Sequence, residues 1–199
     1  MRSLPGTAAA RPDAVGLLDC RFILDPAPLP APNVFAGPYL DRAAHLRKDA
    51  GFVAAAATDP QSLLVPVWRS RSLVRRDADG WSAALVDVQH ELRLSVIDDD
   101  LVMLGRFHGQ VCFAVEVDGK APPAAVPEAT SFEDLRVVGG NLRAEEAGLL
   151  AYARAMVLWR RRHRHCGTCG SPTTVASAGH VMRCSSVSCG EEHFPRLDP

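Results

Sequence analysis

The clearest hydrophobic pattern in the chain lies between residues 145 and 163, in the segment EEAGLLAYARAMVLWRRRH. Apolar residues recur there at steps of three and four, which predicts one helix with a single buried face. Two acidic residues open the segment and basic residues close it, which suits the helix dipole. The expected buried face consists of Leu149, Leu150, Ala153, Met156 and Val157, with Arg154 and Arg161 facing away.

Shorter apolar runs earlier in the chain predict strands. The segments SLLVPVWRSRSLV (62–74) and WSAALVDV (81–88) are expected to be strands joined by the polar turn RRDADG. The segment LVMLGRFHGQVCFAVEV (101–117) predicts two strands that meet at RFHGQ, with one buried face formed by Val111, Phe113, Val115 and Val117. The segment YLDRAAHLRKD (39–49) has helical spacing and predicts a short helix.

The polar and proline-rich segments predict irregular structure. LDPAPLPAP (24–32) indicates an extended lead-in, because proline cannot donate to a sheet ladder. The three adjacent acids Asp98, Asp99 and Asp100 are interpreted as a solvated loop rather than a cation site, since consecutive side chains in a turn diverge.

The composition and charge of the chain indicate which classes of protein it does not resemble. The 199 residues carry 22 Lys+Arg against 23 Asp+Glu, a formal charge of -1. No overall field therefore attracts the chain to nucleic acid or to an anionic membrane. Prolines and acids interrupt every candidate signal segment near the N-terminus, and no run approaches the ~18 apolar residues of a membrane span. We expect a cytoplasmic protein with no membrane partner.

Four of the six cysteines form two pairs, in HCGTCG (165–170) and CSSVSCG (184–190). In a reducing compartment, clustered cysteines indicate a metal site before a disulfide. The remaining two, Cys20 and Cys112, are expected to be small buried apolar residues.

The paired cysteines predict a structural zinc site. Zinc prefers a tetrahedron of soft ligands, which two thiolate pairs on tight turns provide. Each pair ends in Cys-Gly, and glycine permits the positive φ that lets amide groups point toward the sulfurs. The expected metal ligands are Cys166, Cys169, Cys184 and Cys189. Because the protein fills all four positions, the metal is expected to brace the fold and not to catalyse.

Details of the zinc module also follow from the sequence. The segment between the pairs predicts a hairpin that turns near Ser177–Gly179, and EEHFPR predicts a third short strand. Three arginines, Arg164, Arg183 and Arg196, are close enough in sequence to offset the thiolate charge. A redox CxxC is disfavoured because the helix precedes the motif. The nearby histidines are expected at the surface or around the ligands; they are His163, His165, His180 and His193.

With these motifs in place, the chain resembles the NADH pyrophosphatase (NudC-type) family of Nudix hydrolases. The resemblance is carried by VMLGRFHGQVCFAV, by DLRVVGGNLRAEEAGLLAYARAMVLWRRRHRHCGTCGSPT and by CGEEHFPRLDP. It implies an α+β protein with a Nudix-like N-terminal α/β domain over residues 1–163, including the connecting helix 145–163. A rubredoxin-like zinc ribbon over residues 164–199 is expected to follow.

The resemblance also implies an activity that this sequence does not fully encode. The family cleaves NAD(H) to NMN(H) and AMP and removes NAD caps from RNA, using Mg²⁺ or Mn²⁺ held by glutamates of a C-terminal Nudix domain. We expect that domain to be absent here, so the chain is truncated, has no catalytic residues and is inactive alone. The expected partners are NAD(H) or NAD-capped RNA, and a Nudix catalytic domain in cis or in trans.

A degenerate Nudix box can be aligned with residues 127–149. The alignment matches Glu133, Glu145, Glu146, Gly148 and Leu149, but Pro127 replaces the first glycine and Asn141–Leu142 replace the Arg-Glu pair. Since the lost pair removes a metal ligand and the residue that orients it, we expect no catalysis from this segment.

An alternative function is a zinc-ribbon nucleic-acid-binding or interaction module. The basic run Arg160, Arg161, Arg162 and Arg164 lies beside the ribbon, and Trp159 offers a ring for stacking. A helix C-terminus and a thiolate cluster also attract positive charge, so the run has a structural explanation as well. Salt-dependent RNA binding that is lost on substitution of Arg160 and Arg162 would favour the module.

Overall fold

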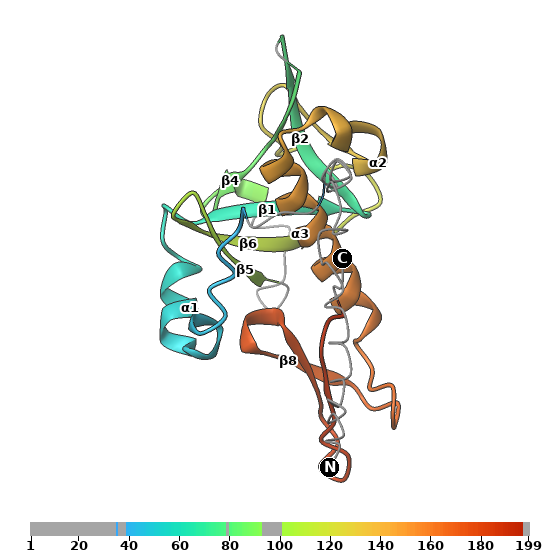
Figure 1. The fold of residues 1–199 in the computed structure, drawn as a ribbon. Helices are drawn as coiled ribbons and strands as arrows, with labels where there is room; N and C mark the ends of the chain where they lie inside the picture. The colour runs from blue at the N-terminus through green and yellow to red at the C-terminus, as the bar shows by residue number, and fades with distance from the viewer. Residues whose placement is uncertain (1–34, 36–38, 79, 93–100, 197–199) are drawn as a thin grey trace, which may run out of the picture. The chain divides into compact units, whose positions relative to one another are not determined.

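A mixed seven-stranded sheet forms the body of the protein in a computed structural model that describes residues 35, 39–78, 80–92 and 101–196 (Figure 1). The strand order is β3-β2-β1-β6-β5, and in addition β4 pairs with β1 and β7 pairs with β2. β1 and β6 are parallel, and the other pairs are antiparallel. The strands are β1 Leu63–Trp68, β2 Arg71–Asp77, β3 Gly80–Ala83, β4 Val86–Asp87, β5 Val102–Phe107, β6 Gln110–Val117 and β7 Thr130–Glu133.

The first predicted strand is in fact two strands. The chain reverses at Arg69 and Ser70, whose φ angles are 49° and 65°. Positive φ at both central residues is the geometry of a tight hairpin turn, which Asn-Gly or Gly-Gly normally signals. Arg-Ser gives no such signal, so the expectation of one strand over residues 62–74 was wrong. The hairpin at RRDADG is confirmed, because β2 pairs with β3 and Gly80 has a φ of 130°.

The helix predicted over residues 39–49 is also wrong. Asp41 instead forms an isolated β-bridge with Arg106, and Ala43 has a φ of 43°. The first α-helix begins later, because the Asp49 side chain accepts a hydrogen bond from the amide of Phe52 and caps it. The helical segments are η2 Leu46–Lys48, α1 Ala50–Ala56, α2 Leu135–Val138, η5 Gly139–Asn141, α3 Ala144–Arg162 and η6 Ser177–Gly179.

The sheet is buried on both faces. On one face it packs against α3, whose five predicted core residues are all buried, and Figure 1 shows this helix crossing the strands. On the other face Phe113, Val115 and Val117 are buried as expected, with Val111 partly buried against them. Cys112 and Ala114, on the α3 side of β6, are fully buried as well. The prediction that Cys112 is a buried apolar residue is therefore confirmed.

A separate three-stranded antiparallel sheet follows α3. Its strands are β8 Thr173–Ala176, β9 Val181–Cys184 and β10 Glu192–His193, in the order β10-β9-β8. The predicted hairpin turn at Ser177–Gly179 and the third strand within EEHFPR are both confirmed. Three predictions lie outside the described residues: the extended segment 24–32, the burial of Cys20 and the acidic loop at 98–100. Over the residues that the structure describes, no helix combines the length and apolar character needed to cross a bilayer.

Candidate metal centre

The first cysteine pair lies on a tight turn immediately after α3. The amide of Gly170 donates to the carbonyl of Cys166 at 2.9 Å, and Gly170 has a φ of 76°. Inside the turn, the amide of Thr168 points at the Cys166 sulfur, 3.4 Å away. The predicted combination of positive φ and amide-to-sulfur hydrogen bonding is therefore present here.

The second pair repeats the design with two extra residues. The amide of Gly190 donates to the carbonyl of Ser186 at 2.9 Å, and Gly190 has a φ of 60°. The amide of Ser186 lies 3.4 Å from the sulfur of Cys184. In each turn the amide of the second residue after the leading cysteine thus donates to its sulfur, and this hydrogen bond by itself favours the thiolate form of that cysteine.

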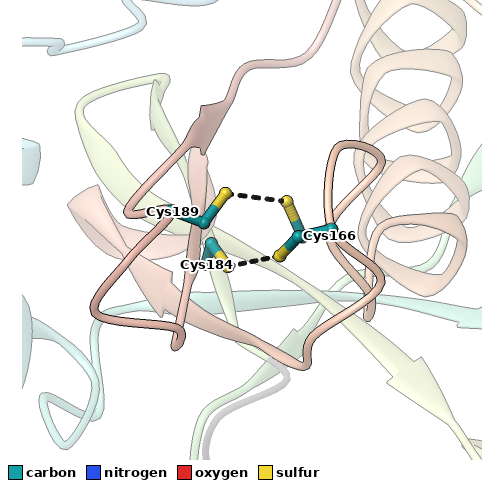
Figure 2. Close-up of side chains that lie close together, drawn as sticks. Cys166, Cys184 and Cys189 are labelled. Atoms are coloured by element: carbon teal, nitrogen blue, oxygen red, sulfur yellow. Dashed lines mark hydrogen bonds between the residues drawn. The ribbon is translucent and has the colours of Figure 1, made fainter.

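The two turns bring the four sulfur atoms together, which confirms that the predicted cysteines form one cluster (Figure 2). All four Sγ atoms lie within 4.8 Å of one another. The Cys166–Cys189 sulfurs are 3.8 Å apart and the Cys169–Cys184 sulfurs 3.4 Å apart. Zn–S bonds of 2.3 Å in a tetrahedron require sulfurs about 3.8 Å apart, whereas a disulfide requires about 2.05 Å. The cluster fits a structural zinc ion.

The four thiols differ in acidity because they compete for the same hydrogen bonds. The backbone amide of Cys169, together with His193 and Thr168, lowers the pKa of Cys166 to about 5. Hydrogen bonds from Ser171 lower the pKa of Cys169. The amide of Glu191 favours the Cys189 thiolate, but the neighbouring cysteines outweigh it and raise the pKa of Cys189 to about 12. A bound cation would replace the protons that the thiols share, so metal binding releases protons.

Two histidines near the cluster lie as expected, whereas one arginine takes a different role. His193 Nε2 lies 3.3 Å from the Cys166 sulfur, as expected of a group around the ligands. His165 is exposed. Arg183, which we expected to offset thiolate charge, instead donates two hydrogen bonds to Glu192, at 2.6 and 2.8 Å. The hydrogen bonds that reach the sulfurs of Cys166 and Cys184 from the turns come from backbone amides.

His180 joins the ribbon to the large sheet, a role that the sequence did not predict. This side chain is 8 % exposed, and its Nε2 lies 2.8 Å from the carbonyl oxygen of Met103 in β5. Its Nδ1 lies 3.2 Å from the guanidinium of Arg47, which also donates to the carbonyls of Arg42 and Leu104. Because a carbonyl can only accept, Nε2 carries the proton and Nδ1 accepts from Arg47.

The surroundings of His180 hold it neutral. Burial, followed by the charge of Arg47, lowers the pKa of His180 to about 4. Next to it, Gly179 has a φ of +90°, and an added Cβ would lie 3.0 Å from the Cα of Val102. The tip of the ribbon therefore packs directly on β5. Gly179 was predicted from the sequence as a turn residue. The contact between His180 and Met103, which are 77 positions apart, had no local sequence signal.

The degenerate Nudix box does not assemble a second metal site. Glu133 accepts a hydrogen bond from Ser131, while Glu145 pairs with Arg143 and lies 3.6 Å from His108. Within the described ranges, the four cysteines are the only group of three or more candidate ligands close enough to share an ion. The geometry gives no support to catalysis by this segment.

Comparison with known proteins identifies both parts of the chain. Residues 61–159 match the NADH pyrophosphatase-like rudimentary NUDIX domain, and residues 161–194 match the NADH pyrophosphatase zinc ribbon domain. The first match covers the large sheet and most of α3. The second covers the cysteine cluster and all three strands of the small sheet.

Curated relatives carry related names. The chain is 32% identical over 145 residues to the NAD-capped RNA hydrolase NudC of Stutzerimonas stutzeri, covering 60% of this chain and 50% of the relative. For NudC of Deinococcus radiodurans the identity is 31% over 105 residues, covering 53% and 35%. For the human NAD-capped RNA hydrolase NUDT12 it is 33% over 65 residues, covering 30% and 14%. The chain thus spans half or less of these relatives. It belongs to the NADH pyrophosphatase (NudC-type) family of Nudix hydrolases, of which it carries the rudimentary NUDIX domain and the zinc ribbon.

Proposed function

We propose that residues 1–163 and 164–199 form the N-terminal domain and the zinc ribbon of an NAD(H) diphosphatase. The reaction is cleavage of NAD(H) to NMN(H) and AMP, or removal of an NAD cap from RNA. Support comes from the two family matches and from relatives named NAD-capped RNA hydrolases. The proposed boundary, between residues 163 and 164, lies shortly after the end of α3 at Arg162 and before the first cysteine pair.

The observation that carries this proposal is the four-sulfur cluster. We propose that Cys166, Cys169, Cys184 and Cys189 bind one structural zinc ion. The cluster offers a complete ligand set, so a zinc ion bound there has no open position for substrate or water. The role of the ribbon is then to support the fold, and any hydrolysis must use other groups. A reducing compartment such as the cytoplasm suits four closely spaced free thiols.

We propose that hydrolysis depends on glutamates that segment 127–149 does not supply. The only Nudix-box alignment, over residues 127–149, lacks the Arg-Glu pair, and its matched glutamates do not gather into a cluster. We therefore propose that the 199 residues are inactive alone. The catalytic glutamates, with their Mg²⁺ or Mn²⁺, belong to a Nudix domain that acts in cis or in trans.

Incubation of the purified chain with NADH and Mg²⁺ or Mn²⁺ tests this proposal, with NMNH and AMP separated by chromatography. We expect no turnover above the background of metal in buffer. Turnover at an enzyme-like rate that is abolished in a Glu145→Ala, Glu146→Ala variant would overturn the proposal. Co-purification with a polypeptide that carries a complete Nudix box would identify a partner in trans, and the nucleotide sequence after codon 199 would reveal one in cis.

A further inference from the structure

The basic run at the end of α3 is not exposed along its whole length. Arg160 is 8 % exposed and donates to the carbonyl of Leu101 at 3.3 Å. Arg161 donates to Glu116 of β6 at 3.1 Å. A flat nucleic-acid-binding patch needs adjacent exposed guanidinium groups, and burial of Arg160 removes it from such a patch.

Three of the arginines instead surround a cavity of about 330 Å³ between α3, β6 and the ribbon. Arg160, Arg161 and Arg164 contribute three positive charges to its lining, against one negative charge from Glu116. Thr173 and Thr174 of β8 add hydroxyl groups, and Val157 and Met182 add an apolar surface. Arg162, in the middle of the same run, is not part of the lining. The lining thus includes three arginines of the basic run and not the fourth.

The end of a helix ordinarily disfavours an anion, because its last carbonyl groups carry partial negative charge. Here part of the last turn, and the segment directly after it, already accept hydrogen bonds through their carbonyls. The carbonyl of Trp159 lies 2.7 Å from His163 Nδ1, and the carbonyl of His163 accepts from the Thr173 hydroxyl at 2.6 Å. The carbonyl of Arg164 accepts from the Thr173 amide at 3.0 Å. The charged side chains of the lining are the three arginines and Glu116.

We infer that this cavity is a binding site for a phosphate group, carried by a free phosphorylated small molecule or by RNA. Guanidinium groups bind phosphate through charge-assisted hydrogen bonds, and hydroxyl groups complete such sites. Glu116 competes with the ligand for Arg161, so phosphate binding exchanges one anionic partner of that arginine for another. The inference does not depend on the hydrolytic function proposed above, since the cavity contains none of the cysteines and no residue of the degenerate Nudix box.

The test is isothermal titration calorimetry, in which inorganic pyrophosphate is added to the zinc-loaded full chain in a phosphate-free buffer. We expect Arg161→Ala and Arg164→Ala to weaken binding about tenfold or more, because each removes charge-assisted hydrogen bonds. Glu116→Gln should strengthen binding, up to about fivefold, since it removes a partly exposed competing charge. Arg162→Ala is the matched control and should leave binding unchanged. Circular dichroism and zinc content establish that each variant is folded.

Two oligoribonucleotides, with and without a 5′-phosphate, distinguish the sources of the phosphate group. Displacement of pyrophosphate by either one shows that the site takes RNA phosphate, and displacement by neither shows that it takes a free phosphorylated molecule. The inference fails if pyrophosphate does not bind, or if Arg162→Ala weakens binding as much as Arg161→Ala. It also fails if Glu116→Gln weakens binding, because the carboxylate would then be part of the site rather than a competitor.

Discussion

The imidazole of His180 donates to the backbone carbonyl of Met103 across 2.8 Å, although the two residues are 77 positions apart. The same ring accepts from Arg47, which also donates to two other carbonyls. One buried side chain therefore connects the tip of the zinc ribbon, the strand β5 and the segment before α1. The link is independent of the covalent connection through α3.

Replacing His180 tests how much this link stabilises the protein. His180→Ala should lower the free energy of unfolding by about 2–3 kcal/mol, because it removes two hydrogen bonds and leaves buried partners unsatisfied. Urea unfolding followed by far-UV circular dichroism measures the change. The control is His165→Ala, an exposed residue of the same module, which should change stability by less than about 0.5 kcal/mol. Equal effects of the two substitutions would contradict the assigned role of His180.

The stability conferred by His180 should depend on pH. Its pKa is lowered to about 4 by burial and by the charges of Arg47, Arg42 and Arg160, with the Tyr152 ring also nearby. The unfolded state, with an ordinary pKa near 6.5, therefore binds more protons than the folded state below that pH. The contribution is fully present above about pH 6.5 and is lost as the pH falls toward 4. Its full size is about 3 kcal/mol.

The measurement is the difference in unfolding free energy between the wild type and His180→Ala at several pH values. Protonation of the zinc ligands affects both proteins and cancels in the difference. We expect the difference to shrink steadily between pH 6.5 and pH 4.5. A difference that stays constant over this range would show that His180 is not held neutral by its surroundings.

Zinc binding should depend on the four clustered cysteines and not on the buried one. Cys166→Ser and Cys189→Ser should reduce bound zinc from about one equivalent to a small fraction, since each breaks the tetrahedral set. Cys112→Ala is the control, because this thiol is fully buried in the sheet and has a pKa raised to about 12 by burial. Elemental analysis of reduced protein reports the stoichiometry. Zinc that persists in Cys166→Ser, or is absent from the wild type, would refute the assignment.

Gly179 should tolerate a side chain less well than other glycines with the same backbone conformation. Gly179→Ala places a Cβ 3.0 Å from Val102, in addition to the strain at a φ of +90°. Gly109 has a φ of +84° with no atom within 4 Å of such a Cβ, so Gly109→Ala isolates the backbone cost, about 1 kcal/mol. We expect Gly179→Ala to cost about 1–3 kcal/mol more, from overpacking. Thermal unfolding of the two variants in parallel would reveal whether the ribbon tip packs as described.

Features encoded locally were predicted well from the sequence. The helix α3 has its apolar stripe and its charged ends within one segment, so a single window contains the whole signal. The two cysteine turns likewise carry their ligands and their glycines together, and the structure places all four sulfurs in one cluster. The fold class was expected from the family resemblance that these motifs carry, and the family models match it.

Features that depend on distant partners were missed. Residues 39–49 have helical spacing, but Asp41 pairs with Arg106 of β5, so tertiary contacts override the local preference. The turn at Arg69 and Ser70 uses residues without a turn signature. Arg160 was identified only as part of a basic run beside the ribbon, yet its guanidinium donates to the carbonyl of Leu101, 59 positions earlier. No local sequence window contains both partners of the contacts made by Asp41 and Arg160.

The two attachments of the ribbon have a mechanical consequence. α3 leads into the first cysteine turn at one end of the small sheet, and the hairpin tip with Gly179 and His180 rests on β5 at the other. A segment that is attached at both ends cannot rotate about one attachment without disturbing the other. A rotation of the cysteine turns therefore has to move the strands of the large sheet as well, because no free hinge separates them.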